Sequence, residues 1–166
     1  TLSTARRLED MGAVDSVVFL TSRNIDAFLR KRFTVSDTAA EAVVTIGLSN
    51  AERVGLRRTR SHLDVGTINI AVRVTPGLSE TGLLEAMSVA VQARTAAVLE
   101  ADIGMETGRA TGTGTDCVAI AAPQGETDYA GLHTDVGEAV GRVVYDAVLE
   151  GALAWKAENQ WRTPKP

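Results

Sequence analysis

Segments typical of strands and helices follow one another along the chain in the order β-α-β-β-α-β-α, after a short first helix. The strand-like segments are short apolar runs, a pattern typical of buried β-strands. They are Asp15–Leu20, Glu41–Leu48, Thr67–Thr75 and Asp116–Ala122. The predicted helices begin at Ser3, Ser22, Ser79 and Thr134, which are N-cap residue types.

This order fits a small layered domain. A chain of 166 residues is too short for a doubly wound sheet with these elements, and the order permits a split-βαβ arrangement. We therefore expect an α/β (α+β) fold, a single-domain two-layer sandwich over residues 1–166. Its mixed, largely antiparallel sheet would have about four or more strands, with helices packed on one face.

Apolar spacing predicts the buried side of each element. In the third strand the buried positions are Ile68, Ile70, Val72 and Val74. In the helix from Ser79 to about Ala101 they are Leu83, Leu84, Met87, Val91 and Val98. In the last helix they are Val136, Val140, Val144, Ala147 and Trp155. The helix after Ser22 would place Ile25, Phe28 and Leu29 on one face.

The last predicted helix contains Gly137, Gly141 and Gly151, which lower its intrinsic stability. Such glycines are tolerable where a helix lies close against a sheet or a partner chain. Aromatic residues make up only 4% of the sequence. Together these features favour a homo-oligomer, most simply a homodimer.

Charge and composition exclude several classes of protein. A net charge of −4 gives no reason to expect a nucleic-acid partner. No apolar run reaches the length of a membrane span and no signal peptide opens the sequence, so we expect a cytoplasmic protein with no membrane partner. The single cysteine, Cys117, excludes an internal disulfide and a Cys-rich zinc site, and its apolar surroundings predict a buried, inert thiol. The start at Thr1 rather than Met is consistent with truncation at the N-terminus.

The segment Ala110–Asp116 (ATGTGTD) is the most informative candidate for chemistry. Gly112 and Gly114 can expose backbone amides, and three hydroxyls and a carboxylate accompany them from Thr111, Thr113, Thr115 and Asp116. Such a loop can hold an anion or an oxyanion. It is not a phosphate P-loop, because the Gly-x4-Gly-Lys spacing is absent and a strand follows. A tight turn with hydroxyls that cap its backbone is the structural alternative.

His133 and Thr134 stand at the start of the last predicted helix, where anions are favoured. His133 is a candidate general base or acid near neutral pH. His62, His133, Asp116 and Glu138 could meet as metal ligands, but no H-x3-H or similar spacing supports a metal site. We predict neither a metal nor another cofactor.

Two further groups of side chains are candidates for ligand binding. Asn50 and Asn69 lie at strand ends, where their amides could orient a substrate amide or serve as turn formers. The basic segment Arg53–Arg60 could meet a phosphate, a nucleotide or a carboxylate, and a solvated loop is at least as good an account of it.

Taken together and in this order, several motifs resemble the adenosylcobinamide amidohydrolase family of corrinoid salvage. The resemblance covers nearly the whole chain, from Val17 to Leu153. Its motifs are VVFLTSRNIDAF, VVTIGLSNAERVG, GTINIAV, LLEAMSVAVQARTAAVLE, ATGTGTDCVAIAAP and YAGLHTDVGEAVGRVVYDAV. Each is weak alone, but GTIN, TGTGTD and YAGxHT are specific as a set.

The resemblance implies hydrolysis of the amide that joins the aminopropanol arm to a corrin propionate, which gives adenosylcobyric acid. The family's shared motif positions fall on Asn50, Thr67, Asn69, Thr111, Gly112, Thr113, Thr115, Asp116, His133 and Thr134. This chain departs from the family in its long helix, where Gln92 and Arg94 replace a Glu and a Lys. It also lacks the Gly pair that usually precedes the first strand.

Hydrolysis of an amide needs an activated water or nucleophile, stabilisation of the oxyanion and a proton for the leaving amine. We expect catalysis from His133, Asp116 and Thr115, with the ATGTGTD loop around the oxyanion. The expected substrate-binding residues are Asn50, Thr67, Asn69, Thr111, Gly112, Thr113, Gly114, Thr134, Gln92 and Arg94. The alternatives are a non-catalytic corrinoid- or tetrapyrrole-binding module, which the changes at Gln92 and Arg94 favour, and a phosphate-ligand enzyme that uses Arg53–Arg60.

Overall fold

The computed structural model describes residues 4–56 and 65–159. Its main sheet has four strands in the order β1-β2-β4-β8. These are β1 (Leu29–Val35), β2 (Thr38–Ile46), β4 (Ile68–Val74) and β8 (Cys117–Ala121). The first three pair antiparallel, whereas β4 and β8 pair parallel. The sheet is therefore mixed and largely antiparallel, as predicted.

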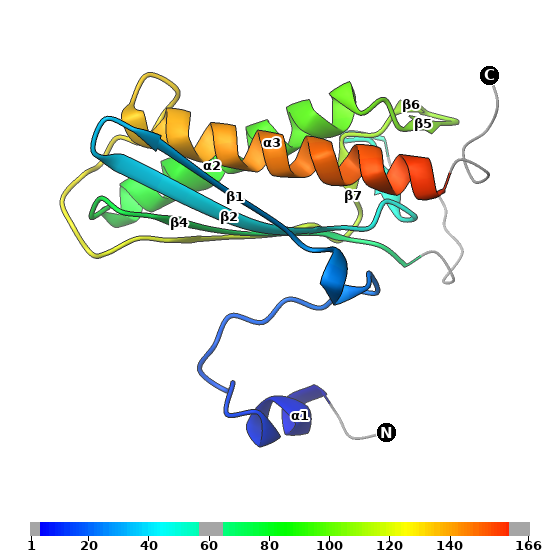
Figure 1. Cartoon of the computed structure of the whole chain (residues 1–166), viewed down its shortest axis with the longest axis horizontal. Coiled ribbons are helices and arrows are strands. Elements are labelled where there is room, and N and C mark those ends of the chain that lie inside the picture. The colour runs from blue at the N-terminus through cyan, green and yellow to red at the C-terminus, as the bar shows by residue number, and fades with distance from the viewer. Residues whose placement is uncertain (1–3, 57–64, 160–166) are drawn as a thin grey trace.

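Two long helices cover one face of this sheet, and two short ribbons lie beyond its edge (Figure 1). The long helices are α2 (Glu80–Glu100) and α3 (Asp135–Glu158). One ribbon pairs β3 (Ala51–Glu52) with β7 (Gly112–Thr113), and the other pairs β5 (Gly104–Met105) with β6 (Gly108–Arg109). A short helix, α1 (Thr4–Asp10), lies apart from the sheet on an N-terminal arm. The α/β class and the packing of helices on one sheet are confirmed.

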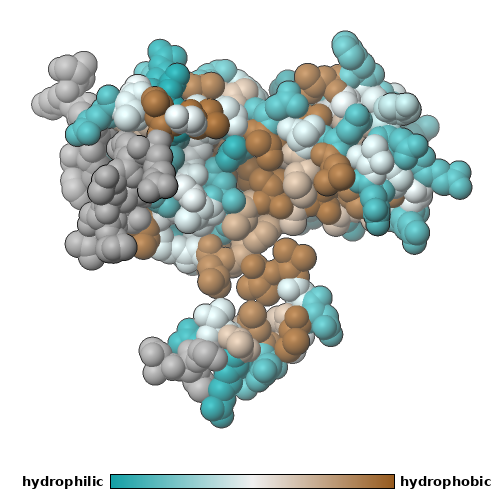
Figure 2. Space-filling model, turned by 180° about the vertical axis from the view of Figure 1, so that it is seen from behind, coloured by the Kyte–Doolittle hydropathy of each residue, from teal (hydrophilic) through white to brown (hydrophobic). Residues whose placement is uncertain are grey.

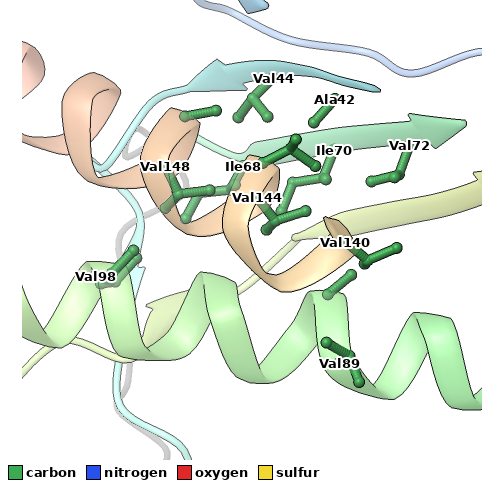
Figure 3. Close-up of a cluster of buried hydrophobic side chains, with 14 of the residues drawn as sticks. Ala42, Val44, Ile68, Ile70, Val72, Val89, Val98, Val140, Val144 and Val148 are labelled. Carbon is green, nitrogen blue, oxygen red and sulfur yellow. The ribbon is translucent and has the colours of Figure 1, made fainter. Parts of the chain in front are cut away.

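The core lies between β4 and the two long helices. Ile68, Ile70, Val72 and Val74 are at most 3% exposed, so the predicted face of this strand is confirmed. Figure 3 shows the side chains of β4 and α3 turned toward each other across this layer. The positions predicted for the last helix are also buried, and they are Val136, Val140, Val144, Ala147 and Trp155.

The predicted stripe of α2 is wrong in part. Val98 is buried, but Leu84 is 67% and Met87 36% exposed, while Leu83 and Val91 are half-buried. The buried residues of α2 are small ones, namely Gly82, Ala86, Val89, Ala90, Ala97 and Val98. Small side chains allow α2 to lie close to α3, and the larger ones are left at the margins of this contact.

The N-terminal part of the prediction is wrong. Residues 15–20 are not a strand, because none of them pairs with a neighbour in the described part of the chain. The expected helix after Ser22 is only a 3-10 turn at Ile25–Ala27, with β1 directly behind it. The sequence of β1 alternates, so Leu29 and Phe33 pack on the core while Arg30 and Arg32 point outward. This period of two favours a strand over a helix.

The split-βαβ arrangement is also wrong. The helix α2 connects β4 to β8, and these two strands are direct neighbours with no strand between them. The unit is therefore an ordinary βαβ crossover, to which the β1–β2 hairpin adds the antiparallel half of the sheet.

Two glycines of α3 lie where the chain approaches itself closely. A Cβ atom on Gly137 would fall 2.8 Å from the carbonyl oxygen of Ala130 and closer still to that of Gly131. A Cβ atom on Gly151 would meet the Ile46 and Leu29 side chains of the sheet. These glycines are thus accounted for by contacts within one chain, and they give no support to a homodimer.

Candidate functional site

Three chain segments meet at one edge of the sheet. Residues 47–50 follow β2, residues 66–67 precede β4, and residues 112–116 precede β8. The end of β2 lies beside the start of β4 because these strands are antiparallel, and the start of β8 lies there because it is parallel to β4. The main chain joins the segments, since Gly47 N donates to Thr67 O at 2.9 Å and Gly114 N donates to Asn50 O at 3.1 Å.

Side chains of these segments form a hydrogen-bonded network. Asn50 Nδ2 donates to the carbonyl of Gly66 at 3.1 Å and to Thr115 Oγ1 at 3.3 Å. Thr115 Oγ1 donates to the same Gly66 carbonyl at 2.9 Å, and Thr67 Oγ1 donates to the carbonyl of Thr115 at 2.6 Å. Asn50 and Thr67 are each 7% exposed. The network therefore fixes the Thr115 hydroxyl and the Asn50 amide in one place.

The carboxylate of Asp116 is fully engaged by its surroundings. Its Oδ1 atom accepts from Ile68 N at 3.1 Å and from Thr113 Oγ1. Its Oδ2 atom accepts from Thr113 N at 3.0 Å and forms an ion pair with Arg94. The Asp116 side chain is only 7% exposed and that of Arg94 15%. All four acceptor positions of this carboxylate are used, which leaves none for the proton of a water molecule.

A cleft of about 620 Å³ opens beside this network. One wall consists of residues 18–22, which we call the strap. The opposite wall consists of Asn50, Val65, Gly66, Thr67, Thr115 and Cys117. The site thus combines the apolar side chains of Val18, Phe19 and Leu20 with polar groups from the sheet edge.

Asn69 and Thr111 lie next to the network but bond elsewhere. Asn69 is on the sheet face away from the helices, and its Nδ2 atom donates to the carbonyl of Leu20 in the strap at 2.9 Å. Thr111 Oγ1 accepts from Val54 N at 2.8 Å and so holds the β3–β7 ribbon. Glycine is required at the centre of the network, because a Cβ atom on Gly112 would collide with Asp116 and with Arg94.

The structure does not bring His133 and Thr134 to this cleft. Thr134 caps α3 by accepting from Gly137 N at 3.0 Å, and the loop before it is held by the bond from Ala130 N to Glu85 at 2.7 Å. In Figure 1 α3 begins at the left end of the body, whereas β7 lies right of its middle. The expectation that His133 joins the ATGTGTD loop is wrong within one protomer, because the whole length of β8 separates them.

Other candidates are also outside the site. Gln92 is exposed on α2. Arg94, two residues further along the helix, is the residue that forms the ion pair with Asp116. Arg53 donates to the carbonyl of Arg109 at 3.2 Å. His62 and the remaining arginines of the basic segment lie outside the described residues.

Cys117 is not the buried thiol that its sequence context predicts. It is exposed and lines the cleft, with its Sγ atom 3.6 Å from the carbonyl of Thr115. The reason is its place on β8, where it pairs with Asn69 on the outer face of the sheet rather than on the core face.

The prediction missed the strap and Thr45. Residues 18–22 fall within one motif of the family resemblance, but their composition is that of an ordinary apolar strand and does not indicate a wall of the cleft. Thr45 pairs directly with Asn69 on the outer face and is only 7% exposed. Its position one residue before the end of β2 could have indicated a polar residue at the site edge.

Within residues 4–56 and 65–159, no three His, Cys, Asp or Glu side chains are grouped so as to hold a metal ion. Neither of the long helices in that part of the chain has the apolar stretch that crossing a bilayer requires.

Comparison with known proteins identifies relatives of the chain. The family model described as adenosylcobinamide amidohydrolase matches residues 2–160. An uncharacterized protein of Methanocaldococcus jannaschii is 31% identical over 94 residues, which cover 54% of this chain and 37% of that protein. The matched region is thus little more than a third of the relative's length. No solved structure matches significantly.

Proposed function

Because this chain belongs to the adenosylcobinamide amidohydrolase family, a family of hydrolases, we propose that it cleaves the amide between the aminopropanol arm and a corrin propionate. The products are adenosylcobyric acid and the amino alcohol. The observation that supports this reaction most directly is the cleft whose inner wall combines Asn50, Thr67 and Thr115. Amide and hydroxyl side chains are the groups that orient a carboxamide.

We assign the residues of the cleft two kinds of role. Thr115 Oγ1 accepts the N–H of the scissile amide, since it lies on the cleft wall and its own proton is bonded to the Gly66 carbonyl. Asn50 holds this hydroxyl in place through its Nδ2 atom. Asp116 is a positioning residue, because its carboxylate is saturated and ties the loop to β4. Arg94 and Thr113 support Asp116 in turn.

The outer face of the sheet is suited to a broad, flat ligand such as a corrin. Its central side chains are small, with Ala71 and Ala121 exposed and Val43 39% exposed. Shallow hollows continue across this face past Arg73. Figure 2 shows apolar surface where the N-terminal arm meets the body of the molecule. A ring bound on this face would reach the cleft with one of its side chains.

Incubation of the full chain with adenosylcobinamide tests the proposal. Chromatography should show adenosylcobyric acid, and the released aminopropanol should appear in equal amount. A shift of the corrinoid absorbance without either product would identify a corrinoid-binding module instead. Absence of both binding and products would exclude the proposed function.

Thr115→Val should reduce kcat/KM for adenosylcobinamide by about tenfold or more, because it leaves Asn50 Nδ2 and the Gly66 carbonyl without their shared partner. His133→Ala provides the comparison at the other end of the sheet, and we expect its kcat/KM to stay within about threefold of that of the wild type. Initial rates measured by chromatography check both values. A larger loss in His133→Ala than in Thr115→Val would show that this cleft does not contain the chemistry.

A further inference from the structure

The amide of Asn69 is only half satisfied in the structure. Its Nδ2 atom donates to the carbonyl of Leu20, whereas its Oδ1 atom is buried and has no hydrogen-bond partner among the described residues. The residue is 4% exposed. A buried acceptor without a donor is unfavourable, so this atom indicates a group that the protein itself does not supply.

Thr45 has the same deficiency directly beside it. Thr45 and Asn69 are register partners on neighbouring strands, and directly opposed residues have side chains in reach of each other. Thr45 Oγ1 is also buried without a hydrogen-bond partner in the described part of the chain. Thr45 and Asn69 are therefore neighbouring polar side chains, each more than nine-tenths buried, and one ligand can bond to both.

The peptide unit that bonds the Asn69 Nδ2 atom cannot also satisfy its Oδ1 atom. In a trans peptide unit the C=O and N–H groups point in opposite directions, and no cis bond occurs among the described residues. The peptide unit after Leu20 can therefore accept from Nδ2 but cannot also donate to Oδ1. A primary carboxamide has a C=O and an N–H on the same edge, so it can form both bonds, and its second N–H can reach a hydroxyl.

We infer that Thr45 and Asn69 form a subsite for a primary carboxamide, which the Leu20 carbonyl occupies in the absence of ligand. The inference rests on the proposed function in one respect, since a corrinoid substrate has several primary carboxamide side chains. The scissile amide is secondary, and the subsite therefore holds a different side chain of the ring. It acts in substrate binding and lies beside Cys117, which lines the cleft.

The strap is attached in a way that permits its displacement. Leu20 is 68% exposed although it is apolar, so little packing holds it. Just after the strap, Arg23 forms two hydrogen bonds with Glu158 at the end of α3, at 2.6 and 2.9 Å. These bonds hold the pKa of the Glu158 carboxyl below its ordinary value. The chain is thus fixed at Arg23, and residues 18–22 can leave Asn69 while the rest of the fold stays in place.

Titration of the ¹⁵N-labelled full chain with acetamide tests the subsite without a corrinoid. The side-chain amide signals of Asn69, assigned through Asn69→Asp, should shift together with the backbone amides of Leu20 and Thr21. Acetate is the matched control because it has no N–H to donate to Oδ1, and it should leave these signals unchanged. Equal shifts with both probes, or none with acetamide, would overturn the inference.

Steady-state kinetics with adenosylcobinamide provide the second measurement. Thr45→Val should raise KM about tenfold with kcat unchanged, because it removes binding that is equal in the ground and transition states. Thr45→Ser should restore KM, and Thr81→Val, at an exposed position in the first turn of α2, should leave KM and kcat unaltered. Wild-type hydrolysis with an unchanged KM in Thr45→Val would refute the subsite alone. Acetamide binding without any hydrolysis would refute the proposed function and leave the subsite standing.

Discussion

Asp116→Asn lowers the free energy of unfolding by about 3–5 kcal/mol, which is the expected result of breaking a buried ion pair from one side. The substitution leaves Arg94 without its counter-ion in a site where its side chain is only 15% exposed. It also replaces one carboxylate oxygen by an NH2 group, which faces N–H donors instead of acceptors. Urea unfolding should show this loss, and the Tm should fall by roughly 2–4 °C for each kcal/mol.

Asp146→Asn is the matched control for this prediction. Asp146 pairs with Arg142 one helical turn away at 2.7 Å, but both side chains are well exposed. Exposed pairs of this kind contribute about 0.3–0.5 kcal/mol. If both variants unfolded at the same urea concentration as the wild type, Asp116 would not be the central support that its hydrogen bonds indicate. Turnover in Asp116→Asn should fall in parallel with its stability.

Gly137→Ala and Gly141→Ala should change stability in opposite directions although they lie one turn apart on α3. A Cβ atom at 137 would collide with the carbonyls of Ala130 and Gly131, so we expect destabilisation of about 1–3 kcal/mol. A Cβ atom at 141 would lie 3.5 Å from a methyl group of Val89, an ordinary contact. There the higher helix propensity of Ala should stabilise the protein by about 0.5–1 kcal/mol.

Thermal unfolding of the two variants beside the wild type checks the signs. Because the substitution and the helix are the same, the difference between the variants isolates the contact with the loop before α3. A fall in Tm for both variants would show that position 141 has no room for a Cβ atom. A rise for both would show that the loop does not approach Gly137 closely.

The parts of the fold that were predicted correctly are those with long or regular patterns. The alternation in β4 and the caps of α2 and α3 each specify one structure, and Ser79 and Thr134 do act as caps. The N-terminal region failed because residues 15–20 have the composition of a strand but no neighbour to pair with. Strand pairing is a tertiary property, and local composition does not contain it.

The sequence predicts which polar residues gather at this edge of the sheet only in part. Strand order brings Asn50, Thr67 and the ATGTGTD loop to one edge, and this follows once β4 and β8 are parallel neighbours. The sequence groups His133 with them because of its chemistry and the family resemblance, whereas the direction of β8 places it at the far end. The role of Leu20 depends on a main-chain carbonyl, for which no side-chain pattern gives a signal.

The three hydrogen bonds of Asp116 to Thr113 and to Ile68, the first residue of β4, have an evolutionary consequence. In a descendant that no longer met its substrate, Gly112, Thr113 and Asp116 would still contribute to the stability of the fold. Mutations would first accumulate at residues whose side chains support no other part of the fold, such as Thr45 and Cys117. The threonine–glycine signature therefore records ancestry and foldability, whereas the residues beneath the strap record whether selection still maintains the pocket.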